Sequence, residues 1–271
     1  MTVPSAGSQE TLLSERSSTE RCADSGRCCP ANPSSPQEAL PASISRDPIE
    51  NRLLAALPRE GFERLLPHLE LTQLTKGDVL YEPGDLIRYA YFPYSGMLSL
   101  LATTEEGMAI EVGVVGNEGM VGTPILLGVG LSLYQVIVQV PSKALRITTE
   151  MLKAAVKQEQ YLQELLLRYT HSLLVQVSQA VICSHFHTLE QRLCRRLLTA
   201  QDCVNQDTFH LTQELLSQLL GARRTGVTQA AGALQEAGLI RYRWGRITII
   251  DRPGLEAVAC ECYQIVKQEL C

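Results

Sequence analysis

The residues with the clearest chemical potential lie between positions 213 and 230. Leu216, Leu220 and Val227 are spaced to form a small core between two crossed helices, and Gly221 stands where the turn needs a positive φ. The second helix would then expose a polar face made of Arg223, Arg224, Thr225, Thr228 and Gln229. Arginine can bind guanine O6 and N7, and glutamine can read adenine. The pattern predicts a helix-turn-helix that reads the major groove of DNA, although a helical hairpin with a solvated face would look the same locally.

The following segment strengthens the DNA-binding interpretation. Leu239–Arg243 and Arg246–Asp251 are predicted strands joined through Trp244-Gly245, and residues 221–252 hold six arginines against two carboxylates. A helix-turn-helix followed by a basic hairpin is a winged helix, whose arginines would bind phosphate and position the protein without specifying sequence. Helices are predicted near residues 188–201, 212–220 and 223–237, with a last one starting near Pro253. The expected DNA-binding residues are Thr212, Gln213, Arg223, Arg224, Thr225, Thr228, Gln229, Arg241, Arg243 and Arg246.

Composition limits the class of protein. The 271 residues suffice for two domains, and 45% apolar with 20% charged residues is typical of a globular protein. The net charge of −5 excludes a bulk polycation, so nucleic-acid binding needs a local basic patch. Nine irregularly spaced cysteines, with no apolar leader in the first 30 residues, argue against a secreted disulfide framework and favour the cytoplasm. Residues 119–142 and 169–189 lack charges, but proline, glycine, histidine or glutamine interrupt them, so no membrane span is expected.

The rest of the chain divides by composition and period. Residues 1–48, rich in Ser, Pro, Glu and Arg, are predicted to be a disordered tail. Residues 49–70 have helical spacing. Residues 71–148 hold short apolar runs separated by glycines, typical of a β-sandwich or barrel. The expected strands are Val79–Tyr81, Tyr89–Phe92, Met97–Leu101, Met108–Val115, Tyr134–Val140 and Ala144–Ile147.

A long helix is predicted over residues 151–182, with apolar residues on two faces. One stripe is Leu162, Leu166, Tyr169, Leu173, Val177 and Ala180, and a second is Leu167, Leu174 and Val181. Such a helix needs two partners, of which one could be the β-domain. The other is expected to be the same helix of a second subunit, and the first stripe is assigned to this dimer contact. A helix buried wholly within one chain is the alternative.

Taken together, residues 49–252 resemble the family of the catabolite activator protein and the fumarate–nitrate regulator. The resemblance rests on the helix-turn-helix from Leu211-Thr212 to Ile240, with its Leu-Gln-Glu-Ala-Gly-Leu-Ile ending, and on the turns Lys76-Gly77-Asp78 and Glu82-Pro83-Gly84-Asp85. It implies an α+β protein with a cyclic-nucleotide-binding-type β-roll (49–150), a dimerisation helix and hinge (151–187) and a winged helix-turn-helix (188–271). It also implies promoter binding as a homodimer and contact with RNA polymerase.

The sequence departs from this family at its effector site. Cyclic-AMP-binding members use a Gly-Glu pair and a later Arg-Ser pair, but here the positions read Gly122-Thr123 and Leu133-Tyr134. A buried phosphate without a cation is costly, so the roll is not expected to bind cyclic AMP in the family manner. Gly122, Thr123, Leu133 and Tyr134 remain the candidate pocket for another, more apolar effector, or for none.

The reading helix also differs from the relatives' helices. Arg224 matches a base-reading arginine of the catabolite activator, whereas Thr225 stands where the known branches have glutamate and Gln229 where they have arginine. Arg223 replaces the usual capping Ser or Thr. A different target half-site is therefore expected.

No metal, cofactor or catalytic site is expected. Cys22, Cys28 and Cys29 do not match the spacing of the family's iron–sulfur branch, and simple exposed thiols are favoured there. The group Cys183, His185 and His187, and the pair Cys260 and Cys262, place residues two apart on a helix, where they point away from each other. Catalytic motifs such as a Gly-x-Ser-x-Gly elbow, a Walker loop or His-Glu-x-x-His are missing from the sequence. The alternatives to a DNA-binding regulator are a ligand sensor or scaffold that uses the winged helix for protein contacts, and a cyclic-nucleotide-regulated enzyme.

Overall fold

The computed structural model describes residues 50–270. The predicted tail over residues 1–48, with its three cysteines, lies outside the described residues. Within residues 50–270, none of the helices combines the length and the apolar character needed to cross a bilayer.

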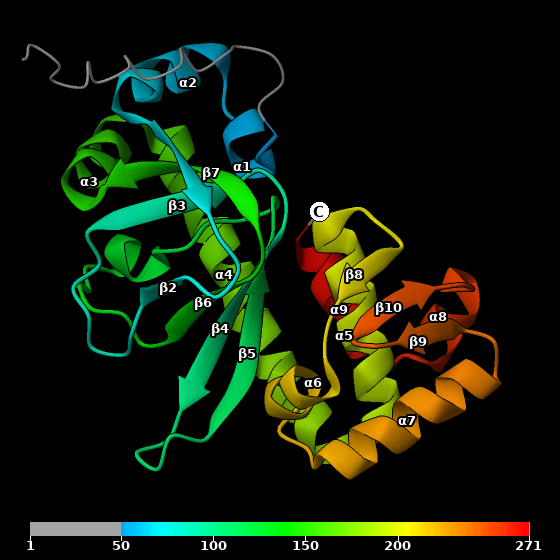
Figure 1. Cartoon of the computed structure of the whole chain (residues 1–271). Coiled ribbons are helices and arrows are strands. Elements are labelled where there is room, and N and C mark those ends of the chain that lie inside the picture. The colour runs from blue at the N-terminus through cyan, green and yellow to red at the C-terminus, as the bar shows by residue number, and fades with distance from the viewer. Residues whose placement is uncertain (1–49, 271) are drawn as a thin grey trace, which may run out of the picture. The chain divides into compact units, whose positions relative to one another are not determined.

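The N-terminal part begins with short helices and continues as two antiparallel sheets (Figure 1). The predicted helical segment 49–70 is broken at Pro58 into α1 (Arg52–Ala55) and α2 (Arg59–Leu65), with the 3₁₀ helix η1 (Leu66–His68) after them. The strands are β1 (Glu70–Leu74), β2 (Val79–Tyr81), β3 (Tyr89–Pro93), β4 (Met97–Thr103), β5 (Ala109–Val115), β6 (Gln135–Val140) and β7 (Ser142–Thr148), with η2 (Thr123–Leu127) between β5 and β6. One sheet has the order β1-β7-β3 and the other β2-β6-β4-β5. The six predicted strands are confirmed, whereas β1 was not predicted.

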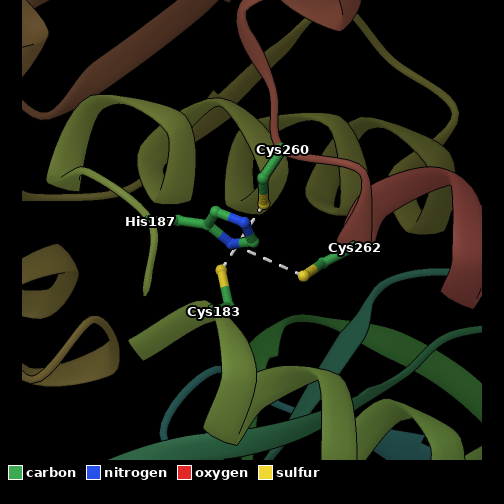
Figure 2. A group of neighbouring side chains, drawn as sticks. All are labelled: Cys183, His187, Cys260 and Cys262. Carbon is green, nitrogen blue, oxygen red and sulfur yellow. Dashed lines mark hydrogen bonds between the residues drawn. The ribbon is translucent and has the colours of Figure 1, made fainter. Parts of the chain in front are cut away.

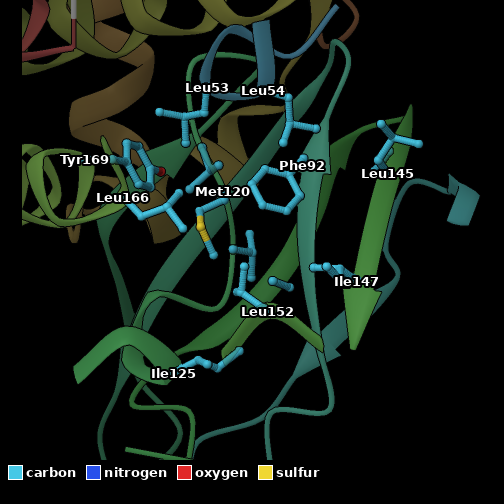
Figure 3. Packing of buried hydrophobic residues seen from close by; sticks show 14 of the residues in the cluster. Leu53, Leu54, Phe92, Met120, Ile125, Leu145, Ile147, Leu152, Leu166 and Tyr169 are labelled. Carbon is cyan, nitrogen blue, oxygen red and sulfur yellow. The ribbon is translucent and has the colours of Figure 1, made fainter. Parts of the chain in front are cut away.

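The two sheets enclose the larger apolar core (Figure 3). Phe92 of β3, Leu145 and Ile147 of β7, and Met120 between β5 and η2 are almost fully buried there. Burying side chains of this size stabilises the fold by about 1.5–3 kcal/mol each. Leu166 and Tyr169 of the following long helix enter the same core, so that helix forms one wall of the β-roll.

The predicted helix over 151–182 is two helices, α3 (Thr149–Gln158) and α4 (Gln160–Phe186). Its first apolar stripe faces inward, because Leu162, Leu166, Tyr169 and Leu173 are buried in the β-roll core. The assignment of these residues to the subunit contact is therefore wrong, and Val177 and Ala180, further along the same stripe, are only half-buried. The second stripe, Leu167, Leu174 and Val181, is exposed in this chain.

Polar contacts also fasten α4 to the β-roll. The side-chain oxygen of Gln176 accepts a hydrogen bond from the backbone N–H of Val114 in β5, and its amide donates to the Val114 carbonyl oxygen at 3.3 Å. Gly119 permits a close approach, since a Cβ atom there would stand 2.2 Å from the hydroxyl oxygen of Tyr169. The register of α4 on the β-roll is thus set by specific pairs as well as by apolar burial.

The C-terminal part has the predicted winged-helix elements together with one further strand and one further helix. They are α5 (Leu189–Val204), β8 (Thr208–His210), α6 (Gln213–Leu219), α7 (Arg224–Glu236), β9 (Ile240–Arg243), β10 (Arg246–Ile249), α8 (Arg252–Val258) and α9 (Cys262–Glu269). The strands form an antiparallel sheet of order β8-β10-β9, in which β8 was not predicted. The last predicted helix, expected to start near Pro253, begins at Arg252 and ends at Val258, and α9 is separate. Leu193, Leu197, Leu216, Val227 and Ile247 form the centre of its core.

Candidate nucleic-acid interface

The helix-turn-helix is built from α6 and α7. Thr212 caps α6, because its hydroxyl accepts a hydrogen bond from the backbone N–H of Leu215 at 3.2 Å. Gly221 follows α6 with a φ of +56°, a left-handed conformation that glycine adopts at low cost. Leu216 and Val227 are fully buried between the helices. The small core and the turn thus lie where the sequence pattern placed them.

The predicted reading face of α7 points away from that core. Arg223, Arg224, Thr225, Thr228 and Gln229 are all exposed. Arg223 occupies the N-cap position without a side-chain hydrogen bond, so no side chain from that position satisfies the first backbone N–H groups of α7. A helix N-terminus in this state combines unpaired N–H donors with a positive dipole end, which favours a phosphate oxygen. The arrangement can bind the backbone of DNA and present side chains to base edges.

Two neighbouring contacts order this face. The Thr228 hydroxyl donates to the side-chain oxygen of Gln213 at 3.0 Å, and Arg224 lies 3.8 Å from the Glu214 carboxylate. Both members of the Arg224–Glu214 pair are well exposed, so the pair contributes little to stability and leaves Arg224 able to change partner. Thr212 and Gln213 are half-buried, and their side chains make hydrogen bonds to α6 and to Thr228; direct DNA contact by them stays a prediction.

The wing presents its charges next to an exposed aromatic ring. Arg241, Arg243 and Arg246 are exposed on β9 and β10. Between them, Trp244 and Gly245 both have positive φ values, 50° and 74°, as a two-residue hairpin turn of type I′ requires. Trp244 is 86% exposed, and the Arg243 guanidinium lies 4.5 Å from the centre of its ring. The sequence pattern indicates Trp244 only as a turn residue, although a large aromatic side chain at a hairpin tip is also a signal for a contact residue.

Two arginines near this surface hold the domain together. Arg252, counted in the basic excess of residues 221–252, bonds Asp202 at 2.8 Å and Glu256 at 2.9 Å. Its charge is therefore compensated within the domain. Arg192 of α5 donates to the carbonyl oxygen of Leu220 at the end of α6. This bond satisfies one carbonyl group of the helix end and fixes the turn before α7.

The wing is also tied to the start of α6. The Tyr242 hydroxyl donates to the carbonyl oxygen of Leu211 at 3.2 Å. Burial raises the pKa of Tyr242, so this hydroxyl stays protonated and remains a donor at neutral pH. The hairpin and the helix-turn-helix consequently keep a defined separation.

The candidate effector residues lie around η2 and β6 of the β-roll. Gly122 has a φ of +107° and precedes Thr123, the first residue of η2. Tyr134 is half-buried against the apolar core, whereas Leu133 is 65% exposed and does not suit a pocket lining. The four Lys and Arg residues between positions 70 and 148 are Lys76, Arg88, Lys143 and Arg146, and none of them is buried. Arg146 is paired with Glu70 at 2.9 Å.

A second group of ligand-type side chains lies at the C-terminal end of α4 (Figure 2). The expectation that Cys260 and Cys262 share a helix is wrong, because Cys260 lies before α9 and Cys262 is its first residue. Cys183 and His187, four residues apart, meet this pair, while His185 is exposed elsewhere. In the sequence the residues near position 185 and the pair at 260 and 262 are separate groups, and only the fold brings them together as a four-residue cluster.

Comparisons with known proteins agree with this architecture. The family model of the Crp-like helix-turn-helix domain matches residues 191–258, and that of the cyclic nucleotide-binding domain matches residues 71–159. Together they cover more than half of the chain. A global nitrogen regulator of Synechococcus elongatus is 24% identical over 216 residues, covering 76% of this chain and 96% of that protein. The global nitrogen regulator of a Nostoc strain is also 24% identical, over 64% of this chain and 82% of its own length.

Solved structures share the fold. A putative transcriptional regulator of the CRP/FNR family from Eubacterium rectale has a TM-score of 0.62 at 18% identity, covering 77% of this chain and 98% of that one. The c-di-GMP-responsive global regulator CLP of Xanthomonas campestris has a TM-score of 0.60 at 17% identity, covering 71% and 99%. The cyclic nucleotide-binding model matches first along the chain and the Crp-like helix-turn-helix model follows it. The chain therefore belongs to the CRP/FNR family of transcription regulators and carries a helix-turn-helix DNA-binding domain.

Proposed function

We propose that this protein binds a palindromic promoter site as a homodimer through α7 and the wing. The observation that carries the proposal is the exposed face of Arg223, Arg224, Thr225, Thr228 and Gln229 on a helix whose opposite side is locked into the domain core. Arg224 and Gln229 have the donors and acceptors that distinguish base pairs in the major groove. The wing arginines would add sequence-independent phosphate contacts.

The exposed stripe of α4 supports the homodimer. Leu167, Leu174 and Val181 recur every seven residues and are 42%, 60% and 61% exposed. A heptad-spaced apolar seam on a long helix is buried when it packs against the same seam of a second copy. A two-fold axis there would present two α7 helices to successive major grooves, about 34 Å apart along the duplex. Such a dimer acts on DNA in the cytoplasm and would recruit or obstruct RNA polymerase.

The β-roll is proposed to act without cyclic AMP. Gly122-Thr123 and Leu133-Tyr134 replace the residue pairs that bind the nucleotide, and the cations of the roll lie on its surface. Moving a cyclic phosphate into an apolar site without a charged partner would cost more than its other contacts return. An effector, if one gates the protein, is therefore less anionic or binds elsewhere.

Selection from random duplexes with the full chain tests the DNA-binding proposal. We expect enrichment of one palindromic motif, and gel shifts on that motif whose affinity falls steeply as the salt concentration rises. A scrambled duplex of equal length is the control. Failure to enrich any motif, or binding that ignores both sequence and salt, would reject the proposal and favour a scaffold that uses the winged helix for protein contacts.

Leu174→Asp tests the dimer. A carboxylate in the seam should convert the dimer to a monomer in sedimentation experiments and abolish binding to the full palindrome. Arg168→Asp is the matched control, since Arg168 is exposed on the same helix and lies about 120° around its axis from Leu174. A Leu174→Asp protein that stays dimeric would show that the subunits meet elsewhere.

A further inference from the structure

Four side chains that commonly bind metal ions converge where α4 meets the C-terminal helices (Figure 2). Cys183 lies in the last turn of α4 and His187 immediately follows that helix. Cys260 lies between α8 and α9, and Cys262 opens α9. One ligand atom from each residue lies within 4.8 Å of the others. Residues more than 70 positions apart in sequence thus form one compact donor set.

The spacing of the donor atoms suits a single ion. The Sγ atoms of Cys183 and Cys260 are 3.6 Å apart, and the Sγ atom of Cys262 is 3.6 Å from Nδ1 of His187. Tetrahedral zinc has Zn–S distances of about 2.3 Å and Zn–N distances of about 2.0–2.1 Å, which separates neighbouring ligand atoms by about 3.5–3.8 Å. The sulfur atoms are also too far apart to be a disulfide, whose S–S bond is about 2.05 Å.

The histidine is oriented as a ligand. Its Nε2 atom lies 3.2 Å from the Glu261 carboxylate, and its side chain is only 11% exposed. A carboxylate accepts hydrogen bonds, so Nε2 carries the proton and the lone pair of Nδ1 faces the sulfur atoms. A carboxylate that holds the far nitrogen of a ligating histidine in this way is the usual support of a zinc site.

The cysteines have no evident role in apolar packing. Cys183, Cys260 and Cys262 form a buried cluster of their own, separate from the two apolar cores. Three thiolates, a neutral histidine and a divalent cation would leave one negative charge. Arg195 supplies a positive charge that acts on all three thiols. A bound divalent cation would add to this positive charge at the three sulfur atoms.

We propose that Cys183, His187, Cys260 and Cys262 bind one zinc ion in a tetrahedral Cys₃His site, with Glu261 as the carboxylate that orients His187. All four protein ligands are present, so the site is closed and structural. It joins the end of α4 to the α8–α9 junction, directly before Thr188, the N-cap residue of α5. Zinc would thereby fix the winged helix to the long helix at the hinge between them.

The first test measures metal in the full-length, tag-free protein. After purification in reductant and exchange against zinc, mass spectrometry of the metal should give one zinc ion per chain. Replacement with Co²⁺ should give the visible bands of tetrahedral cobalt and sulfur-to-cobalt charge transfer. Zinc far below one per chain together with no cobalt bands would overturn the proposal. Iron with inorganic sulfide, or a Cys183–Cys260 disulfide isolated from cells in place of metal, would also overturn it.

Matched variants locate the ion. Cys262→Ser should lose the zinc, whereas Cys194→Ser should keep it, because both cysteines are fully buried but only Cys262 belongs to the cluster. His187→Gln should lose it and His185→Gln should not. Glu261→Gln should weaken zinc binding about 10- to 100-fold in competition with a chromophoric chelator.

Cysteines outside the described residues are tested in the same way. The combined variant Cys22→Ser, Cys28→Ser, Cys29→Ser and Cys271→Ser should retain one zinc ion per chain. Loss of zinc in this variant, with retention in Cys262→Ser, would assign the ion to the termini and overturn the proposal. Because metal content is read without DNA, failure here would leave the proposed DNA binding intact.

Discussion

The β-roll and the winged helix each have the fold of the family domain that they match, but they differ in where they place their charged side chains. In the winged helix, the polar residues of α7 and the arginines of the wing point outward from an apolar core. In the β-roll, the interior is apolar and Lys76, Arg88, Lys143 and Arg146 all lie outside it. Two apolar cores can therefore carry different polar surfaces, because apolar packing and the placement of charge depend on different residues.

One buried ion pair connects the two regions. Glu111 of β5 lies 2.6 Å from Arg196 of α5, and their side chains are 7% and 4% exposed. Ser99 also donates to the Glu111 carboxylate, and Arg196 reaches the sulfur of Met97 at 3.2 Å. Burying both charges is costly, so the pair is better suited to specifying how the regions meet than to adding stability.

Removing the Glu111–Arg196 ion pair should change the stability of the protein more than any other substitution proposed below. Arg196→Met leaves the Glu111 carboxylate buried without its partner, and we expect the free energy of unfolding to fall by about 3–5 kcal/mol in urea titration. The double variant Glu111→Leu, Arg196→Met should recover most of this loss, because no buried charge remains. A single variant that loses less than about 1 kcal/mol, the scale of an exposed ion pair, would show that the pair does not connect the two regions in solution.

The loss in Arg196→Met should depend on pH. Burial raises the pKa of the Glu111 carboxyl, and the positive charge of Arg196 opposes that rise. Without Arg196 the pKa of Glu111 in the folded state lies still higher than in the native protein. The unfolding free energy of each protein falls as the pH rises from the ordinary glutamate pKa to its own folded-state pKa of Glu111. The deficit of the variant should therefore be smallest near the ordinary glutamate pKa and should grow as the pH rises above the folded-state pKa of the native protein. Urea titrations of both proteins across this pH range measure it.

Within the winged helix, Arg224→Ala should weaken binding to the selected duplex by about 1–3 kcal/mol and relax sequence preference at one position. The reason is the loss of a guanidinium that can pair with a base edge. Competition gel shifts with single-base variants of the site measure both effects. Arg59→Ala, which removes an exposed arginine of α2, is the control and should change neither. Uniform weakening across all sites would instead assign Arg224 to phosphate contact.

Arg243→Ala should have a smaller and less selective effect. We expect affinity to fall to a similar degree for all duplexes, and the slope of log affinity against log salt concentration to decrease in magnitude by about 1. Salt titrations by fluorescence anisotropy give the slope. A loss confined to particular sequences would show that the wing takes part in base recognition.

For the β-roll we expect no effect of cyclic AMP. Micromolar to millimolar cyclic AMP should leave the unfolding temperature unchanged, because a ligand stabilises a protein only if it binds the native state. The same thermal-shift experiment with c-di-GMP, to which the Xanthomonas relative responds, is the informative comparison. Stabilisation by micromolar cyclic AMP would contradict the reading of Gly122-Thr123 and Leu133-Tyr134.

Much of this architecture was predictable from local patterns. Gly221, the buried Leu216 and Val227, and the turn at Trp244-Gly245 all take the conformations that their types and spacing indicate. The two strands β1 and β8 were missed for different reasons. Glu70–Leu74 adjoins a helical pattern with little alternation, and Thr208–His210 has only three residues. The break at Glu159 between α3 and α4 was missed because no proline or glycine marks it.

By itself the sequence determined the helix-turn-helix, the wing and the apolar periods of the strands, because these depend on residues within a few positions of one another. Tertiary structure decided which stripe of α4 faces the β-roll, since either apolar face could have been covered. It also decided the pairing of Glu111 with Arg196, and the meeting of Cys183 and His187 with Cys260 and Cys262. Contacts across 70 or more residues follow from how packed elements are arranged in space, and no local spacing records that arrangement.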